Sequence, residues 1–157
     1  MEKVTVVIPN YNGIKYLDDC LEALYTQSAE CGFRVIVVDN GSTDGSVGQA
    51  KEKFPRVEWI CLKENTGFCH AVNEGIKASA TEYVIMLNND TKVYEGFVQN
   101  LYEAIEKDKR IFSVSAKMLQ WDNPELVDDA GDRYCVLGWG FARGKGKPAC
   151  DYDKPVK

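Results

Sequence analysis

The sequence lacks the features that mark several large classes of protein. Its 157 residues contain no segment that approaches the roughly 18 apolar residues of a membrane-spanning helix. The start, Met1 to Lys3 before a short apolar run, has no long apolar segment like that of a secretory signal peptide. The net charge is −5 and no long basic run occurs, which argues against nucleic acid as a partner. These absences predict a protein with no transmembrane segment and no broad basic face.

Metal-binding patterns of cysteine and histidine are also missing. The six cysteines are scattered without a C-x-x-C pair, and several lie inside apolar patterns, as small core residues do. The single histidine, His70, directly follows Cys69, and adjacent side chains on a helix point apart. The pattern predicts reduced thiols in a cytoplasmic protein and argues against a zinc site.

Three common nucleotide-binding or phosphate-accepting folds lack their signatures here. No G-x-G-x-x-G follows the first apolar run, and the spacing from Gly140 to Lys145 is one residue short of a P-loop. A receiver domain needs paired carboxylates after its first strand, where this chain has Pro9 and Asn10, although Lys117 would suit one. The basic clump from Arg143 to Lys147 is more typical of a solvated loop than of a phosphate or membrane contact.

What is present is the pattern of an α/β domain. A hydrophobic content of 45% and a charged content of 27% are ordinary for a globular protein with a real core. Apolar runs rich in β-branched residues alternate with helical patterns, which predicts a Rossmann-like open, mainly parallel twisted sheet with helices on both faces. The predicted strands are 4–8, 33–38, 57–62, 83–87 and 111–118, and the helices run from about 14 to 24, 46 to 54, 68 to 78 and 94 to 108.

Several local features are predicted within this pattern. We expect Pro9 to end the first strand and Asn12 to cap the first helix. We expect the first helix to bury a stripe of four side chains and the third helix to bury three, namely Ile14, Leu17, Leu21 and Leu24, and Ala71, Val72 and Ile76. The alternation stops after Met118, so residues 1–118 are predicted as an α/β domain and residues 119–157 as a loop-rich extension.

Polar side chains follow three of the predicted strands. They are Asn10 to Asn12, Asp39 with Asn40, and Asn88 to Asp90. Because the carboxyl ends of parallel strands open on one edge, where ligands bind, these groups are expected to share a crevice. A lone carboxylate among amides suits a magnesium ion shared with phosphates, although Asn and Asp also dominate plain turns. Tyr11 could stack on a base, and Asp39 could accept hydrogen bonds from a base or ribose.

Four segments together resemble the family 2 glycosyltransferases of the GT-A fold. Residues 6–12 (VVIPNYN) resemble the opening of that family, and residues 37–45 (VVDNGSTDG) its second-strand motif. Residues 65–68 (NTGF) with 73–76 (NEGI) resemble a third segment, and residues 87–90 (LNND) stand where the family has its D-x-D. The resemblance covers roughly residues 3–118, and the Asn-Asn-Asp form is similar to the rhamnosyltransferase-like branch.

The resemblance implies inverting, metal-assisted transfer of a sugar to an acceptor hydroxyl in cell-wall or surface polysaccharide biosynthesis. The donor would be a UDP- or dTDP-linked sugar and the acceptor a glycan or a lipid-linked molecule, in the cytoplasm or at the inner face of the membrane. Asp90 would bind magnesium or manganese. The implied donor-binding residues are Pro9, Asn10, Tyr11, Asp39, Asn40, Asn65, Gly67, Asn73, Asn88 and Asn89.

Two departures from the family pattern qualify this prediction. Asn88 replaces the first acid of the D-x-D and brings no charge, so the donor phosphates would supply much of the charge that holds the metal. The family's general base lies in a later Glu-Asp motif, which is absent after Asp90. Asp128 and Asp129 are weak substitutes, so the base is expected beyond Lys157 in a longer enzyme. The alternative is a non-catalytic nucleotide- or carbohydrate-binding module on the same fold.

Overall fold

The computed structural model describes residues 2–154, which form two compact units that divide between Glu103 and Ala104. The first unit contains β1 (Val4–Asn10), α1 (Leu17–Tyr25), β2 (Phe33–Asp39), α2 (Ser46–Lys53), β3 (Glu58–Cys61), α3 (Phe68–Ala78), β4 (Tyr83–Met86) and most of α4 (Phe97–Glu106). The second contains β5 (Met118–Leu119), β6 (Val127–Asp129), β7 (Asp132–Tyr134), β8 (Gly140–Ala142) and the 3₁₀ helix η1 (Ala149–Tyr152).

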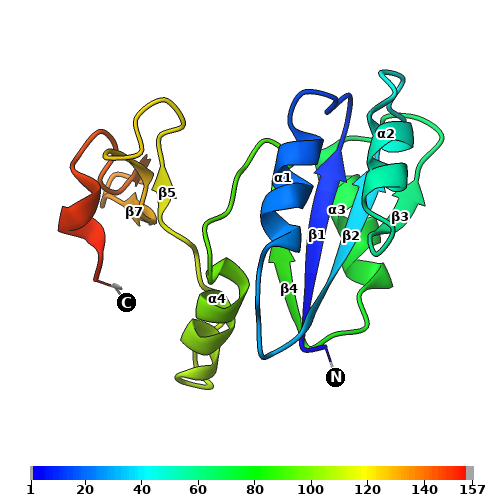
Figure 1. The fold of residues 1–157 in the computed structure, drawn as a ribbon. Coiled ribbons are helices and arrows are strands. Elements are labelled where there is room, and N and C mark those ends of the chain that lie inside the picture. Colours follow the sequence, from blue (N-terminus) through cyan, green and yellow to red (C-terminus); the bar gives the residue numbers. More distant parts are fainter. Residues whose placement is uncertain (1, 155–157) are drawn as a thin grey trace. The chain divides into compact units, whose positions relative to one another are not determined.

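The first unit is built on a four-stranded parallel sheet in the order β3-β2-β1-β4. Helices lie on both faces of this sheet (Figure 1). On one face, side chains of β1 pack with α1, α2 and Val98 of α4, and on the other, Val7 packs with Ile36, Val38 and Ala71 of α3. Both faces of β1 are therefore buried, as its continuous apolar composition requires. The predicted α/β fold class is confirmed.

Helix α3 lies so close to the sheet that one of its inward positions must be glycine. A Cβ atom on Gly75 would lie only 2.3 Å from Cγ1 of Val7. Ala71, Val72 and Gly75 are the buried residues of the helix, whereas Ile76 is 40% exposed. The prediction that Ile76 points inward is wrong, because Gly75 takes the inward position in this turn and has no apolar side chain that would reveal it in the sequence.

Strand β1 does not end at Pro9 as predicted but continues through Asn10, which pairs with Asp39 of β2. The carbonyl of Asn10 accepts a hydrogen bond from Asn40 N–H on the β2 side. Backbone groups alternate along a strand, so Pro9 faces the other side, where β4 has already ended after pairing with Val7. The missing N–H of Pro9 therefore costs the sheet no hydrogen bond.

The start of α1 also differs from the prediction. Helix α1 begins at Leu17, whose N–H donates to the carbonyl of Gly13, and the capping position belongs to Tyr16. Asn12 has a positive φ of 51° and its side-chain oxygen accepts a hydrogen bond from Thr43 N–H. Asn12 therefore ties two loops together instead of capping the helix, and Ile14, which precedes the helix, is 39% exposed.

The fifth predicted strand, residues 111–118, is also wrong. Only Met118 and Leu119 form a strand, and β5 pairs antiparallel with β6 in the second unit. Phe112 is 96% exposed. An apolar run becomes a strand only where a neighbouring strand offers hydrogen-bonding groups, and composition does not reveal that neighbour. The second unit also contains the antiparallel pair β7–β8.

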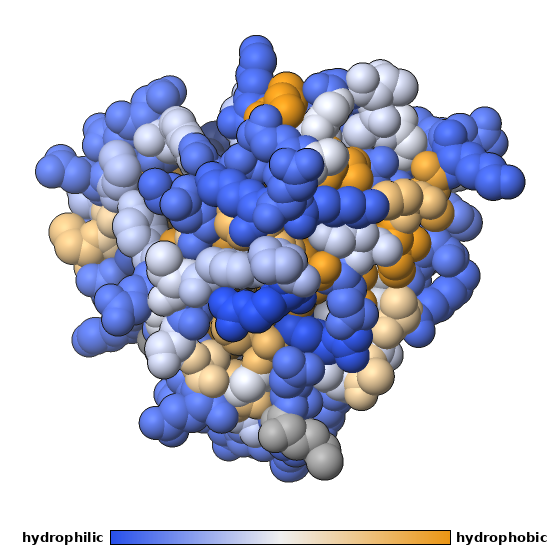
Figure 2. Space-filling view, turned by 45° about the vertical axis from the view of Figure 1, so that its right-hand side comes forward, coloured by the Kyte–Doolittle hydropathy of each residue, from blue (hydrophilic) through white to orange (hydrophobic). Residues whose placement is uncertain are grey.

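The polar surface and the cysteines are those of an ordinary globular protein. Hydrophilic side chains cover most of the face shown in Figure 2, with smaller apolar patches between them. All six cysteines are free thiols. Among residues 2–154 no helix has the length and apolar content needed to cross a bilayer.

Candidate functional site

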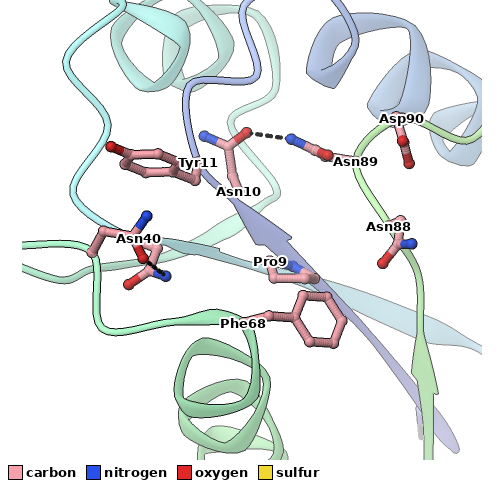
Figure 3. Close-up of a pocket in the computed structure, with 9 residues that line it drawn as sticks. Pro9, Asn10, Tyr11, Asn40, Phe68, Asn88, Asn89 and Asp90 are labelled. Atoms are coloured by element: carbon pink, nitrogen blue, oxygen red, sulfur yellow. Dashed lines mark hydrogen bonds between the residues drawn. The ribbon is translucent and has the colours of Figure 1, made fainter.

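A cavity of about 350 Å³ opens where β1, β2 and β4 end. It brings together polar residues from three strand ends that are far apart in the sequence (Figure 3). The crevice predicted at this edge of the sheet is therefore present. Its lining residues are Pro9, Asn10, Tyr11, Asn40, Asn65, Phe68, Asn88, Asn89 and Asp90.

Asn10 connects the strand ends to one another. Its side chain is almost fully buried, and its Nδ2 donates to Asp39 Oδ1 at 2.9 Å and lies 3.2 Å from the hydroxyls of Ser42 and Ser46. Its Oδ1 accepts a hydrogen bond of 2.8 Å from Asn89 Nδ2. Both ends of this amide are thus occupied within the protein, as a buried polar group requires.

Asp39 lies next to Asn10 but is not among the residues that line the cavity. It is 4% exposed, and it accepts hydrogen bonds from Asn10 and from both the N–H and the hydroxyl of Ser42. This carboxylate therefore organises the loop after β2. Direct contact with a base or ribose would require it to share oxygens that are already in use.

Asn40 holds the loop that leads into α3. Its Nδ2 donates to Asn65 Oδ1 at 3.0 Å and to the Gly67 carbonyl at 3.2 Å, and its Oδ1 accepts from the N–H and hydroxyl of Thr66. Gly67 has a φ of 89°, which favours glycine. Asn73 is exposed on α3 and, like Gly67, does not line the cavity.

The Asn40 contacts predict a large effect of substitution on this loop. Asn40→Ala removes four hydrogen bonds that are partly buried, so we expect a loss of about 2 kcal/mol in the free energy of unfolding. The loop that carries Asn65 and Phe68 should also exchange its amide hydrogens faster. Urea denaturation and hydrogen exchange measure both effects. Gln49→Ala, an exposed change on α2, serves as the control, and equal behaviour of the two variants would contradict the role of Asn40.

Asp44 connects the loop after β2 to the segment before α1 through hydrogen bonds. Its carboxylate accepts hydrogen bonds from Ile14 N–H at 2.8 Å and from the N–H and hydroxyl of Ser46 at 3.0 and 2.7 Å. Burial alone would raise the pKa of this carboxyl, but the hydrogen bonds from Ser46 and Ile14 together lower the pKa below its ordinary value of 3.8.

A pH dependence of stability follows from this lowered pKa. The folded state holds the Asp44 carboxylate more strongly than the unfolded state, so its stabilisation is complete above pH 3.8 and is lost as the pH falls below it. Asp44→Ala should lower the free energy of unfolding by about 2 kcal/mol at neutral pH. The difference from the unsubstituted protein should shrink in acid. A difference that stays constant down to acid unfolding would contradict this prediction.

Two aromatic side chains stand at the cavity. Tyr11 is 49% exposed and Phe68, the first residue of α3, is 58% exposed. Figure 3 shows Phe68 near Pro9, between Asn40 and Asn88. Sequence reasoning did not select Phe68 as a site residue. The sequence contained a signal for it, because Phe68 directly follows Gly67 and begins a helix that comes after a polar loop.

The turn after β4 carries the only acidic side chain among the nine lining residues. The Cys20 thiol of α1 lies beneath it, 3.7 Å from the Asn88 carbonyl oxygen, and burial raises the pKa of this thiol to about 12. Asp90 is exposed, and none of the ion pairs found among residues 2–154 includes it. The Asp90 carboxylate is therefore available to a ligand.

The donor set at this turn suits a hard cation only in part. Asp90 and the side-chain oxygen of Asn88 are the kind of oxygen ligands that magnesium and manganese accept. Yet the described residues contain no group of three or more His, Cys, Asp or Glu side chains that could hold a metal alone. One carboxylate fits a cation that is shared with a ligand's own oxygens.

The sequence matches a known family over most of its length. The sequence model of "Glycosyl transferase family 2" matches residues 5–130. Glycosyltransferase GlyG of Streptococcus pneumoniae serotype 4 is 35% identical over 112 residues, which are 68% of this chain and 36% of GlyG. Glycosyltransferase GlyA of the same organism is 33% identical over 107 residues, 66% of this chain and 15% of GlyA. The chain thus spans only a minor part of these relatives.

Solved structures agree with this match. S. aureus TarS 1-349 is similar in fold, with a TM-score of 0.62, 24% identity, and coverage of 75% of this chain and 40% of the TarS 1-349 chain. The mannosyltransferase PcManGT of Pyrobaculum calidifontis, solved with GDP-Man and Mn²⁺, has a TM-score of 0.63 at 26% identity and covers 69% of this chain and 33% of its own. Because the family model matches well over half of the chain and its fold is that of GT-A enzymes, the protein belongs to glycosyl transferase family 2.

Proposed function

We propose that this chain is the donor-binding part of an inverting glycosyltransferase that uses a nucleoside-diphosphate-sugar. The observation that carries the proposal is the single cavity lined by three strand ends, with an aromatic ring, Tyr11, on one side and a carboxylate, Asp90, on the other. Such a site can hold a base at one end and a diphosphate at the other. PcManGT, a structural neighbour, was solved with a donor of this chemical class, GDP-Man.

The charge of the cavity supports a shared cation. Its nine lining residues include one carboxylate and no lysine, arginine or histidine. A diphosphate placed there would face Asp90 with no basic side chain to offset its charge, and like charges repel strongly where water is partly excluded. A bound divalent cation would offset this repulsion. Asp90, with Asn88 beside it, is the residue we propose to hold magnesium or manganese.

The reaction needs stabilisation of the departing diphosphate above all. A bound cation would supply Lewis-acid stabilisation of the charge that develops on it. The chain's own contribution is to orient the donor: Asn40 fixes the loop with Asn65, and Pro9, Tyr11 and Phe68 offer apolar surface for rings. Asn65 and Asn88 offer amide groups at the cavity wall.

The general base is proposed to lie outside the cavity residues described above. Asp90 is the only carboxylate in the lining and is assigned to the cation. Asp128 pairs with Lys145 at 3.3 Å, and Asp129 accepts a hydrogen bond from Gly131 N–H. Both acids thus have partners within the second unit, and neither is proposed as the base.

The acceptor is proposed to be a glycan or lipid-linked hydroxyl in the synthesis of a cell-surface polymer, at the inner face of the membrane. A Staphylococcus epidermidis relative, 32% identical over 97 residues, is a teichoic acid poly(glycerol phosphate) polymerase. This relative supports the class of polymer and says nothing of the sugar. The donor-binding unit would serve the same purpose for any acceptor presented beside the Asn88–Asp90 turn.

The proposal is tested by calorimetric titration with UDP, dTDP and GDP, each with and without Mn²⁺. We expect at least one diphosphate to bind, and to bind more tightly with Mn²⁺. Absence of binding by all three under both conditions would overturn the proposal. A non-catalytic module on the same fold is distinguished by adding downstream residues from the same reading frame: transfer or donor hydrolysis that appears only then supports the enzyme.

A further inference from the structure

The sheet splits at the cavity. Strand β1 pairs with β4 as far as Val7 and Met86, but with β2 as far as Asn10 and Asp39. The last backbone hydrogen bond on the β4 side runs from Leu87 N–H to the Val7 carbonyl at 3.0 Å. Within the part of the chain that the structure describes, no backbone hydrogen bond joins residues 88–90 to β1. Something other than the sheet must hold this turn in place.

A pair of side-chain amides spans the split. Asn89 Nδ2 donates to Asn10 Oδ1 at 2.8 Å (Figure 3). Asn10 Nδ2 in turn donates to Asp39 Oδ1 at 2.9 Å. Because Asn10 is 1% exposed, its hydrogen bond to Asp39 is buried and its hydrogen bond from Asn89 is partly shielded from competing water. The bridge therefore connects the turn that carries Asp90 with the strand that leads to Asn40.

Gly13 covers this amide bridge. A Cβ atom on Gly13 would lie 2.2 Å from Asn10 Oδ1 and 2.4 Å from Asn89 Nδ2, which no real contact allows. Gly13 is buried, does not line the cavity, and is not among the glycines with positive φ. Glycine is therefore needed at this position for space and not for backbone conformation.

We infer that Asn10 and Asn89 are positioning residues, and that their bridge, packed under Gly13, sets the place of Asp90 relative to the nucleotide side of the cavity. A shared cation would have to contact the Asp90 carboxylate and the diphosphate at the same time. Displacement of the turn would therefore weaken the metal-dependent part of diphosphate binding before the metal-independent part. The inference rests on the proposed function. The role of Asn10 differs from direct contact with the donor, because both ends of its amide already form hydrogen bonds within the protein.

The test compares the metal-dependent and metal-independent parts of nucleotide binding. The probes are UDP or dTDP, whichever binds the unsubstituted protein more tightly, and the corresponding monophosphate without metal. For Gly13→Ala and for Asn89→Ala we expect the gain in diphosphate affinity on adding Mn²⁺ to fall about tenfold, because small displacements of a positioned group are costly. The monophosphate affinity should change by less than about twofold. Gly48→Ala, an exposed glycine of α2 with nothing within 4 Å of the added Cβ, is the matched control.

The double variant Gly13→Ala/Asn89→Ala shows whether both changes act on one bridge. If they do, adding Mn²⁺ raises the diphosphate affinity of the double variant by the same factor as that of Asn89→Ala alone, because Asn89→Ala has already removed the bridge. Additive losses would overturn the inference, as would equal losses for monophosphate and diphosphate or an unchanged metal gain in Asn89→Ala. Asn89→Ala adds no bulk and carries the test by itself if Gly13→Ala does not fold.

Failure of this inference and failure of the proposed function give different results. If the unsubstituted protein binds no diphosphate, the donor-binding role falls and the inference falls with it. If it binds with a clear Mn²⁺ gain that Asn89→Ala and Gly13→Ala leave intact, the function stands and only the positioning role of the bridge is overturned.

Discussion

Replacing Asp90 by alanine should abolish the effect of Mn²⁺ on nucleotide binding while leaving the fold intact. Asp90 is the single carboxylate of a cavity that has no basic lining residue, so it is the only lining side chain with a full charge for a cation. In Asp90→Ala the ratio of diphosphate dissociation constants without and with Mn²⁺ should fall to about one. The carboxylate is exposed and outside the core, so the free energy of unfolding should change by less than about 0.5 kcal/mol.

Two further variants sharpen this result. Asp90→Asn keeps the size of the side chain and removes only the charge, so it should lose most of the metal effect as well. Asp19→Ala removes an exposed carboxylate of α1 that does not line this cavity and should behave like the unsubstituted protein. A full Mn²⁺ effect in Asp90→Ala would show that the cation, if bound, is held elsewhere. Calorimetry with UDP, dTDP and GDP measures all three.

Replacing Gly75 by alanine should strongly destabilise the first unit. The added Cβ would lie 2.3 Å from Cγ1 of Val7 and 3.1 Å from Cγ2 of Val38. Both valines are completely buried, and β-branched side chains cannot rotate away easily, so helix α3 must move off the sheet. Overpacking of this kind costs about 3 kcal/mol, and the better helix propensity of alanine returns about 1 kcal/mol. We therefore expect a net loss of about 2 kcal/mol in urea denaturation.

The same substitution at an open position provides the control. Gly48 of α2 has nothing within 4 Å of the place that an added methyl group would occupy, so Gly48→Ala should stabilise the protein by about 0.5 to 1 kcal/mol. Val7→Ala should have a smaller cost in the Gly75→Ala protein than in the unsubstituted one, because it removes the clash. If Gly75→Ala is as stable as Gly48→Ala, the close contact of α3 with β1 is not rigid.

The sheet and the position of the cavity were predictable because they depend on local patterns. Runs such as Val35 to Val38 are apolar throughout, and only strands buried on both faces need that composition. Once parallel strands are assumed, their polar ends must meet at one edge. This simple geometry brought residues such as Tyr11, Asn40 and Asp90 to one cavity.

The internal use of the polar groups was not predictable. Asn10 bonds to residues 29, 36 and 79 positions away, and no local pattern indicates which of many Asn, Asp and Ser side chains will meet. For the same reason Asp39, a candidate for base contact, is largely occupied by Ser42 and Asn10. The 111–118 segment failed differently, because its strand character depended on a partner strand that composition does not specify.

The unequal pairing of β1 also limits how such a site can change. The pairing of β1 with β2 continues for 10 − 7 = 3 residues after its pairing with β4 has ended. At about 3.3 Å per residue this leaves a notch about 10 Å deep in the edge of the sheet. A one-residue insertion in β1 would turn Asn10 to the opposite face of the sheet, so the depth of the notch can change only in steps of two residues. Finer adaptation to a longer or shorter ligand is therefore left to the loops on its rim.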